Sequence, residues 1–154
     1  MWSAFLIVHM LVAVALIGAI THQAFSICWP NRDRSKSFVA SFRGVNGMTY
    51  TNAIIILFIL TVVLGSIIYP YYRLNVRTVL ERLRLFAANG SFEIKEHLIS
   101  IGLGLLPAYW YFWRQPLGDD NRTTRAILTM MLAFIVWWGF MVGHVLNNIR
   151  GFGS

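Results

Sequence analysis

The stretch Ala126–Ile149, AILTMMLAFIVWWGFMVGHVLNNI, decides the fold. It carries no formal charge over 24 residues, and a helix of that length, rising about 1.5 Å per residue, can cross the hydrocarbon core of a bilayer. Gly139 and Gly143 stand one turn apart in it, and His144 follows at once. Small residues four apart let a second helix approach closely in lipid. We expect His144 to face protein, because an unpaired imidazole is costly in lipid.

The composition of the whole chain supports a membrane protein. Of its 154 residues, 57% are hydrophobic and only 12% are charged, far from the balance of soluble domains. The net charge of +7 lies almost entirely between the apolar runs, so lipid headgroups and acidic neighbouring subunits are the expected partners, and nucleic acid is not. Cys28 is the single cysteine, which excludes an internal disulfide and a cysteine-based metal cluster.

Three further apolar runs accompany this stretch. The sequence predicts an all-α integral membrane four-helix bundle, a single domain over residues 1–154 with spans at about 2–29, 46–72, 94–113 and 126–149. The first run continues too far, and lacks the basic start, to be a signal peptide, so we expect a retained helix. Ala15 and Ala19 give it a small-residue packing face. Pro70 is expected to help to stop the second span.

One short amphipathic helix is predicted at about 76–89. Val79, Leu80, Leu83 and Phe86 recur at helical spacing among arginines, and Asn89-Gly90 predicts its end. This helix lies either on the membrane surface or against a partner subunit. Ser91 is then expected to begin the third span.

Four spans place both termini and the surface helix on one side of the membrane. That side carries six cationic residues and the other side carries seven, so the positive-inside rule leaves the orientation open. We expect the protein in the inner (cytoplasmic) membrane of a bacterium.

Three of the four histidines fall in the same half of the bilayer. At about 1.5 Å per residue, His9 and His144 lie roughly 10 Å inside the side of the termini, and His97 lies nearer its surface. His9 with His144, or His97 with His144, could supply the two axial ligands of a b-type haem, which would pass single electrons. The haem propionates would then point toward three arginines, Arg73, Arg77 and Arg150.

Other interpretations of these residues stay open. Each histidine could simply hydrogen-bond within the bundle, as structural polar groups do. Gly18 one turn before His22 is similar to the ligand pattern of bacteriochlorophyll-binding helices. Lys95, Glu96 and His97 could form an interfacial proton or quinone site, although consecutive residues cannot all face one pocket. The spans lack a relay of carboxylates, which argues against a stand-alone pump.

The segment from His9 to Gly18, HMLVAVALIG, resembles the first helix of small cytochrome b-like membrane proteins related to the copper-resistance family CopD. The resemblance covers this helix and the four-span layout. It implies a histidine-rich membrane bundle that handles haem or copper. Met10, Met130, Met131 and Met141 form no compact copper motif, and His22 has no counterpart in the pattern.

These observations predict a membrane subunit of an electron-transfer or respiratory complex that binds one b-type haem. It is not expected to be an enzyme on its own, and larger membrane subunits are its expected partners. The alternative is a cofactor-free structural or assembly subunit. A small transporter or quinone-site protein is the third class.

Overall fold

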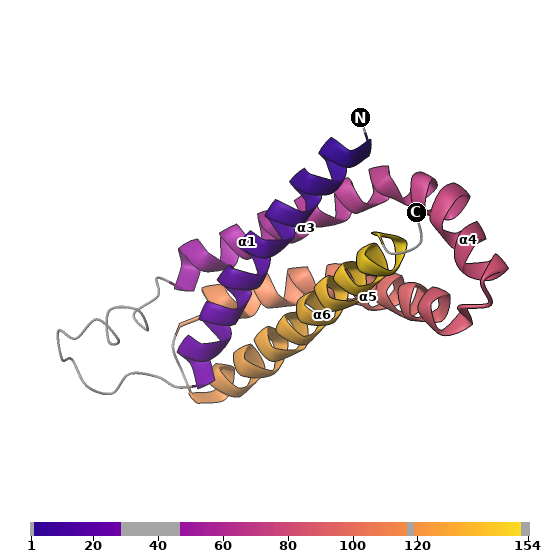
Figure 1. Ribbon diagram of the computed structural model, residues 1–154. Coiled ribbons are helices and arrows are strands. Elements are labelled where there is room, and N and C mark those ends of the chain that lie inside the picture. Colours follow the sequence, from indigo (N-terminus) through magenta and orange to yellow (C-terminus); the bar gives the residue numbers. More distant parts are fainter. Residues whose placement is uncertain (1, 29–46, 117–118, 152–154) are drawn as a thin grey trace.

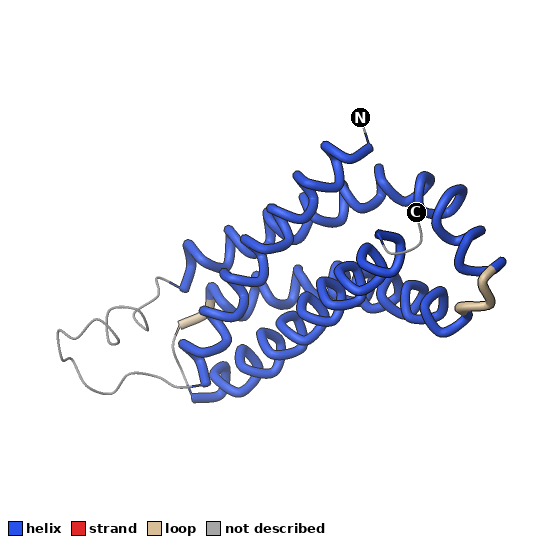
Figure 2. The backbone as a smooth tube through the Cα atoms, viewed as in Figure 1, coloured by secondary structure: helices blue, strands red, loops and turns tan. Residues whose placement is uncertain are grey.

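The computed structural model describes residues 2–28, 47–116 and 119–151, and these are helical apart from short turns (Figure 2). The elements, in chain order, are α1 (Trp2–Cys28), α3 (Gly47–Tyr71), a π-helical turn (Tyr72–Val76), α4 (Arg77–Arg82), α5 (Phe86–Arg114) and α6 (Asp119–Gly151). The described part of the chain contains no strand. The prediction of an all-α protein is confirmed.

Three stretches are long and apolar enough to cross a membrane, namely Trp2–Cys28, Thr49–Arg82 and Asn121–Asn148. Their apolar side chains point outward as well as inward: Leu11, Ile56 and Ile127 are all more than half exposed. In water such surfaces would be unstable, whereas lipid solvates them. The membrane prediction is therefore confirmed for these helices. The predicted third span, within α5, is not among them. The uncharged part of that helix, His97–Trp113, is only 17 residues long and includes a histidine, a proline, two tyrosines and two tryptophans.

The four long helices alternate in direction. Figure 1 shows the start of α1, the end of α6 and α4 at one end of the molecule, which we call the terminal end. The end of α1, the start of α3 and the link from α5 to α6 lie at the opposite end. α1 packs against α3 and α6, and α5 packs against α6 and α3. Each helix therefore has two neighbours, as in an up-and-down bundle.

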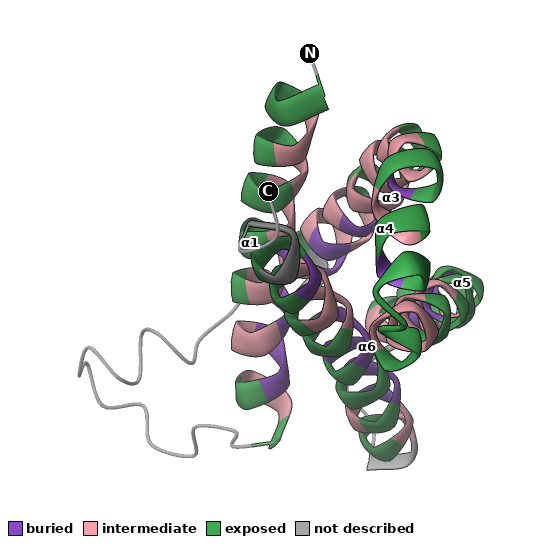
Figure 3. Cartoon of the chain, turned by 45° about the vertical axis from the view of Figure 1, so that its right-hand side comes forward, coloured by how far each residue is buried: buried purple, intermediate pink, exposed green. Residues whose placement is uncertain are grey.

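The hydrophobic core occupies only the half of the bundle near the opposite end. Four helix segments build it: the second half of α1, the first half of α3, the second half of α5, and α6 up to its middle. Its buried residues are Leu16, Ile20, Ala24, Ile54, Phe58, Leu106, Tyr109, Leu128, Leu132, Ala133, Ile135 and Val136. Figure 3 shows buried segments where these helices cross and mostly exposed or half-exposed segments toward the terminal end, where Tyr72, Leu80 and Leu146 are buried. The helices thus leave room between them at the terminal end.

Pro70 does not stop the second span, contrary to the prediction. α3 includes Pro70, and the chain continues through the π-helical turn into α4. Proline removes one hydrogen-bond donor and crowds the preceding turn. A wider turn with a shifted hydrogen-bond register is one way a helix accommodates such a disturbance. The predicted surface helix is consequently joined to α3 without a loop.

The break after that helix comes earlier than predicted. It lies at Leu83–Leu85, where Arg84 has a φ of 56°, and the amide of Leu85 donates to the carbonyl of Leu80 at 2.9 Å. Asn89-Gly90 therefore lies inside α5 and does not end the short helix, contrary to the prediction. Ser91 is also interior to α5, since its hydroxyl donates to the carbonyl of Ala87 at 2.8 Å. The local end signals were outweighed because packing stabilises a helix more than propensity does.

Candidate functional site

A cavity of about 380 Å³ lies where the terminal half of the bundle lacks a core. All four long helices line it, and its floor is formed by the core residues Leu16, Phe58 and Val136. Trp2 and Tyr71 line its outer part and stack with ring centroids 5.5 Å apart. The volume is within the range of small-molecule and cofactor sites, which combine apolar walls with a few polar groups. We call it the inner cavity.

His9 reaches the inner cavity from α1. Its ring lies beside Gly65 of α3, with Cε1 3.4 Å from where a β-carbon on that glycine would stand. Its Nδ1 is buried and has no hydrogen-bond partner among the described residues. Buried polar atoms are nearly always satisfied in native proteins. The unsatisfied nitrogen therefore indicates a place where a ligand, a metal centre or a water would bind.

His144 lines the same cavity from α6. The side-chain amide of Asn148, one turn later, donates to its Nε2 at 3.1 Å. The Phe140 ring lies parallel to the imidazole with centroids 6.2 Å apart. Both contacts come from α6 itself and are exposed, so they can be exchanged for a ligand at small cost. Two imidazoles from neighbouring helices thus line one cavity.

A charged pair from α5 completes the polar lining. Lys95 and Glu96 both line the inner cavity, and Lys95 Nζ lies 3.0 Å from Glu96 Oε1. The Lys95 ammonium also lies 4.0 Å from the centroid of the Phe92 ring, a cation–π contact. Both charged side chains line the cavity together with His9. The sequence had grouped this pair with His97.

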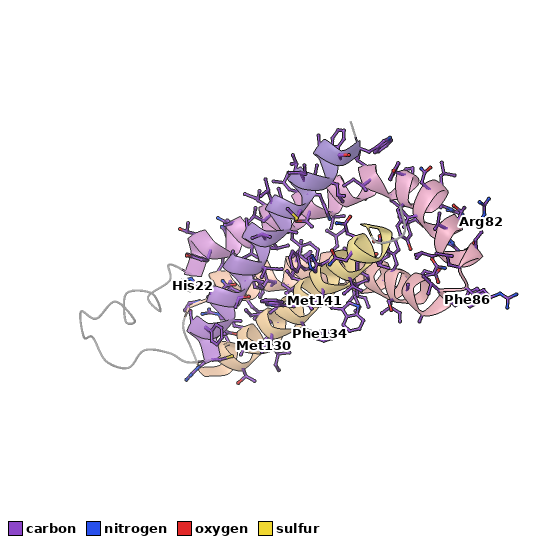
Figure 4. All side chains as sticks on the ribbon, viewed as in Figure 1. His22, Arg82, Phe86, Met130, Phe134 and Met141 are labelled. Carbon is purple, nitrogen blue, oxygen red and sulfur yellow. The ribbon has the colours of Figure 1, made fainter. Side chains whose placement is uncertain are left out.

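His97 and His22 lie elsewhere. His97 is exposed, and its Nδ1 donates to the carbonyl of Glu93 at 2.7 Å. It lines a second, smaller pocket outside the inner cavity. His22 packs beside Tyr50, with ring centroids 5.2 Å apart, and Figure 4 shows it at the opposite end of the bundle from Arg82. Among the pairs considered from the sequence, the structure brings His9 and His144 to one cavity.

Two of the three predicted propionate partners, Arg73 and Arg77, are not among the described residues that line the inner cavity. Arg73 is exposed and Arg77 lines the second pocket, and neither belongs to the described lining of the inner cavity. Arg77 Nε is 2.7 Å from Glu81 Oε1, and its Nη1 is 3.5 Å from Glu93 Oε1. The side chain of Arg150 lies outside the described residues. Lys95 is the cation in the described lining.

The small residues singled out for helix packing behave differently from one another. A β-carbon on Gly139 would lie 3.2 Å from Cδ1 of Ile99, so this glycine stands at a close approach of α6 to α5. At Gly143 the described residues place no such atom within 4 Å, and it lines the inner cavity instead. Ala19 packs against the core, whereas Ala15 is exposed.

Two buried polar clusters were missed by reasoning from the sequence. In the first, Gln23 donates to Thr51 Oγ1 at 3.1 Å and accepts a hydrogen bond from the Tyr109 hydroxyl. In the second, Arg125 is 3% exposed and donates to the backbone carbonyls of Phe112, Gln115 and Pro116. These carbonyls lie at the end of α5 and just beyond it, where the backbone no longer continues the helical hydrogen bonds. In the sequence, the signal for the first cluster is Gln23, a glutamine inside an apolar run.

The described residues do not provide a set of ligands for a metal ion outside a haem. They contain no group of three or more histidine, cysteine or acidic side chains that could hold a metal ion. The four methionines considered for copper are each 42% or more exposed, and Figure 4 shows Met130 and Met141 spaced apart along α6. Cys28 is exposed.

The fold and the cavity define an all-helical membrane protein with a histidine-lined cavity in one half of its helix bundle. Comparison with protein-family models, with curated protein sequences and with solved structures finds no match to this chain.

Proposed function

We propose that the protein is an electron-transfer subunit of a bacterial inner-membrane complex, and that it holds one b-type haem between His9 and His144. The observation that carries the proposal is the inner cavity, to which two different helices contribute an imidazole and in which one buried ring nitrogen lacks a partner. Bis-histidine sites of this kind are built from facing helices in bundle cores. We propose as well that α5 crosses the membrane beside α6.

We assign the residues of the cavity distinct roles. A haem bound there would alternate between ferric and ferrous iron and so pass single electrons. His9 and His144 would hold the iron through neutral ring nitrogens, with Asn148 exchanging its contact with His144 as the ligand binds. Leu16, Phe58 and Val136 would give the haem an apolar contact on the inner face of the cavity. Lys95 supplies a positive charge for a carboxylate.

The test is the visible spectrum of the purified protein, recorded reduced minus oxidised. We expect the sharp bands of a six-coordinate b-type haem in the wild type, and the loss of these bands in His9→Ala and in His144→Ala. His97→Ala and His22→Ala serve as matched controls, because these histidines lie outside the inner cavity, and both should keep the bands. Each variant must elute as the folded species on size-exclusion chromatography.

A colourless wild type, purified from cells supplied with a haem precursor, would overturn the proposal and favour the cofactor-free assembly subunit. Loss of the bands in His97→Ala with their retention in His9→Ala would contradict the assignment of the ligands.

A further inference from the structure

Glu96 separates two hollows of the molecule. Besides the inner cavity, the structure has an outer pocket of about 230 Å³ at the terminal end, lined by Tyr69, Tyr72, Arg77, Asn89, Phe92, Glu93, Glu96 and His97. Tyr69, Tyr72, Phe92 and Glu96 line both the pocket and the cavity. These four residues are therefore the wall between them.

Three members of this wall form a tight aromatic layer. Tyr72 and Phe92 stack with centroids 3.6 Å apart and an interplanar angle of 13°, and Tyr69 lies 6.3 Å from Phe92. The Tyr72 hydroxyl is turned to Asn89 of the outer pocket, at 3.4 Å. Stacked rings exclude water. A proton would therefore cross the wall at its carboxyl group, Glu96.

The surroundings of Glu96 suit this role. Its side chain is 45% exposed and lines the outer pocket as well as the inner cavity. On the inner side it lies beside Lys95, whose side chain is 17% exposed, and it lines the inner cavity together with His9. The other charged or titratable groups among the described lining of the two hollows are His144 from α6, Tyr69 and Tyr71 from the end of α3, Tyr72 from the π turn, Arg77 from α4, and Glu93 and His97 from α5.

An electron that enters the inner cavity adds one negative charge to a region of low dielectric. An uncompensated charge is costly there. We infer that Glu96 takes up one proton from the outer pocket when an electron enters the inner cavity, and returns it when the electron leaves. This inference rests on the proposed haem site.

The step balances in atoms and charge. A one-electron donor delivers the electron to the cavity, and water in the outer pocket supplies the proton to the Glu96 carboxylate. A one-electron acceptor later removes the electron, and the Glu96 carboxyl group returns the proton to the outer pocket. The net charge of the cavity and its wall is then the same in both redox states.

The experiment is a redox titration of the haem-loaded full-length protein in nanodiscs at a series of pH values. In the wild type we expect the midpoint potential to fall as pH rises. The largest slope expected is about 59 mV per pH unit, which corresponds to a tenfold change in the one-electron reduction equilibrium for each tenfold change in proton concentration. Glu96→Gln should keep the haem spectrum and lose most of this pH dependence. Glu93→Gln is the matched control, since Glu93 lines only the outer pocket, and it should retain the wild-type slope.

A wild-type slope in Glu96→Gln would overturn the inference and leave the haem assignment standing, whereas an absence of haem in the wild type would overturn both. Should Glu96→Gln fail to retain haem, Glu96→His decides the question. An imidazole at this position keeps a titratable group but moves the pH range of the dependence toward that of histidine. An unmoved range would contradict the role of Glu96.

Discussion

At the scale of single residues, the packed half of the bundle depends on polar side chains that share their hydrogen bonds inside it. Gln23, Thr51 and Tyr109 are each no more than 1% exposed and come from three different helices. An amide buried among apolar side chains is costly unless both its donor and its acceptor are paired. Here the Gln23 amide donates to Thr51 and accepts from Tyr109, so the cluster fixes the rotation of α1 relative to α3 and α5.

The exchange Tyr109→Phe tests this cluster. It removes the hydroxyl donor and leaves the Gln23 oxygen without that partner, while the aromatic ring stays in place. We expect a loss of about 0.5–2 kcal/mol in the free energy of unfolding, near the range measured for buried hydrogen bonds in water and in membranes. The measurement is the unfolding midpoint of the purified protein in mixed detergent micelles. Tyr111→Phe is the control, because Tyr111 is 53% exposed, and it should leave the midpoint unchanged.

At the scale of the elements, α5 depends on one glycine for its approach to α3. A β-carbon on Gly102 would lie 2.7 Å from Cζ of Phe58 and 3.2 Å from Cγ2 of Ile135. Phe58 is 1% exposed, so its ring has no free space to enter. The two helices can pack this closely only because position 102 lacks a side chain.

Gly102→Ala should therefore destabilise the protein by about 1–3 kcal/mol, as other overpacked cores are destabilised. The matched control is Gly104→Ala on the same helix, where the described residues place no atom within 4 Å of an added β-carbon. We expect this control to be neutral or slightly stabilising, because alanine favours a helix over glycine. The thermal midpoint of the two variants in detergent is the measurement, and equal midpoints would contradict the close approach.

At the scale of the whole molecule, the two halves of the bundle are packed differently. The half near the opposite end is packed, and its polar clusters lock the helices together. The terminal half contains the inner cavity, which under the proposed function would hold the haem. Binding sites commonly occupy such less stable regions of a fold. Loading the cavity is therefore expected to stabilise the terminal half most.

The arrangement of the four helices also makes a topological prediction. In a Cys28→Ser background, cysteines at Asn75 and Asn148 should be labelled by an impermeant thiol reagent from one face of the membrane, and a cysteine at Arg122 from the other face. These three positions are exposed. If α5 instead lay on the membrane surface, the cysteine at Arg122 would be labelled from the same face as that at Asn75, and the one at Asn148 from the other.

The sequence by itself determined the helical class and the three stretches, in α1, α3 and α6, that are long and apolar enough to cross a membrane. A long uncharged segment in lipid must pair every backbone group within the chain, and a helix does this. The short helix was predicted too long, and α5 too short, because their boundary depends on tertiary contacts rather than on Asn89 and Gly90.

Only the tertiary structure decided which side chains meet. Depth does not specify the rotation of a helix about its axis, and this rotation is set by packing, as at Gly102 and in the cluster around Gln23. That is why His97 lies outside the inner cavity while His9 and His144 line it. For the same reason Lys95, which the sequence did not suggest as a propionate partner, is the cation of the described lining, and Glu96 lies between the cavity and the outer pocket.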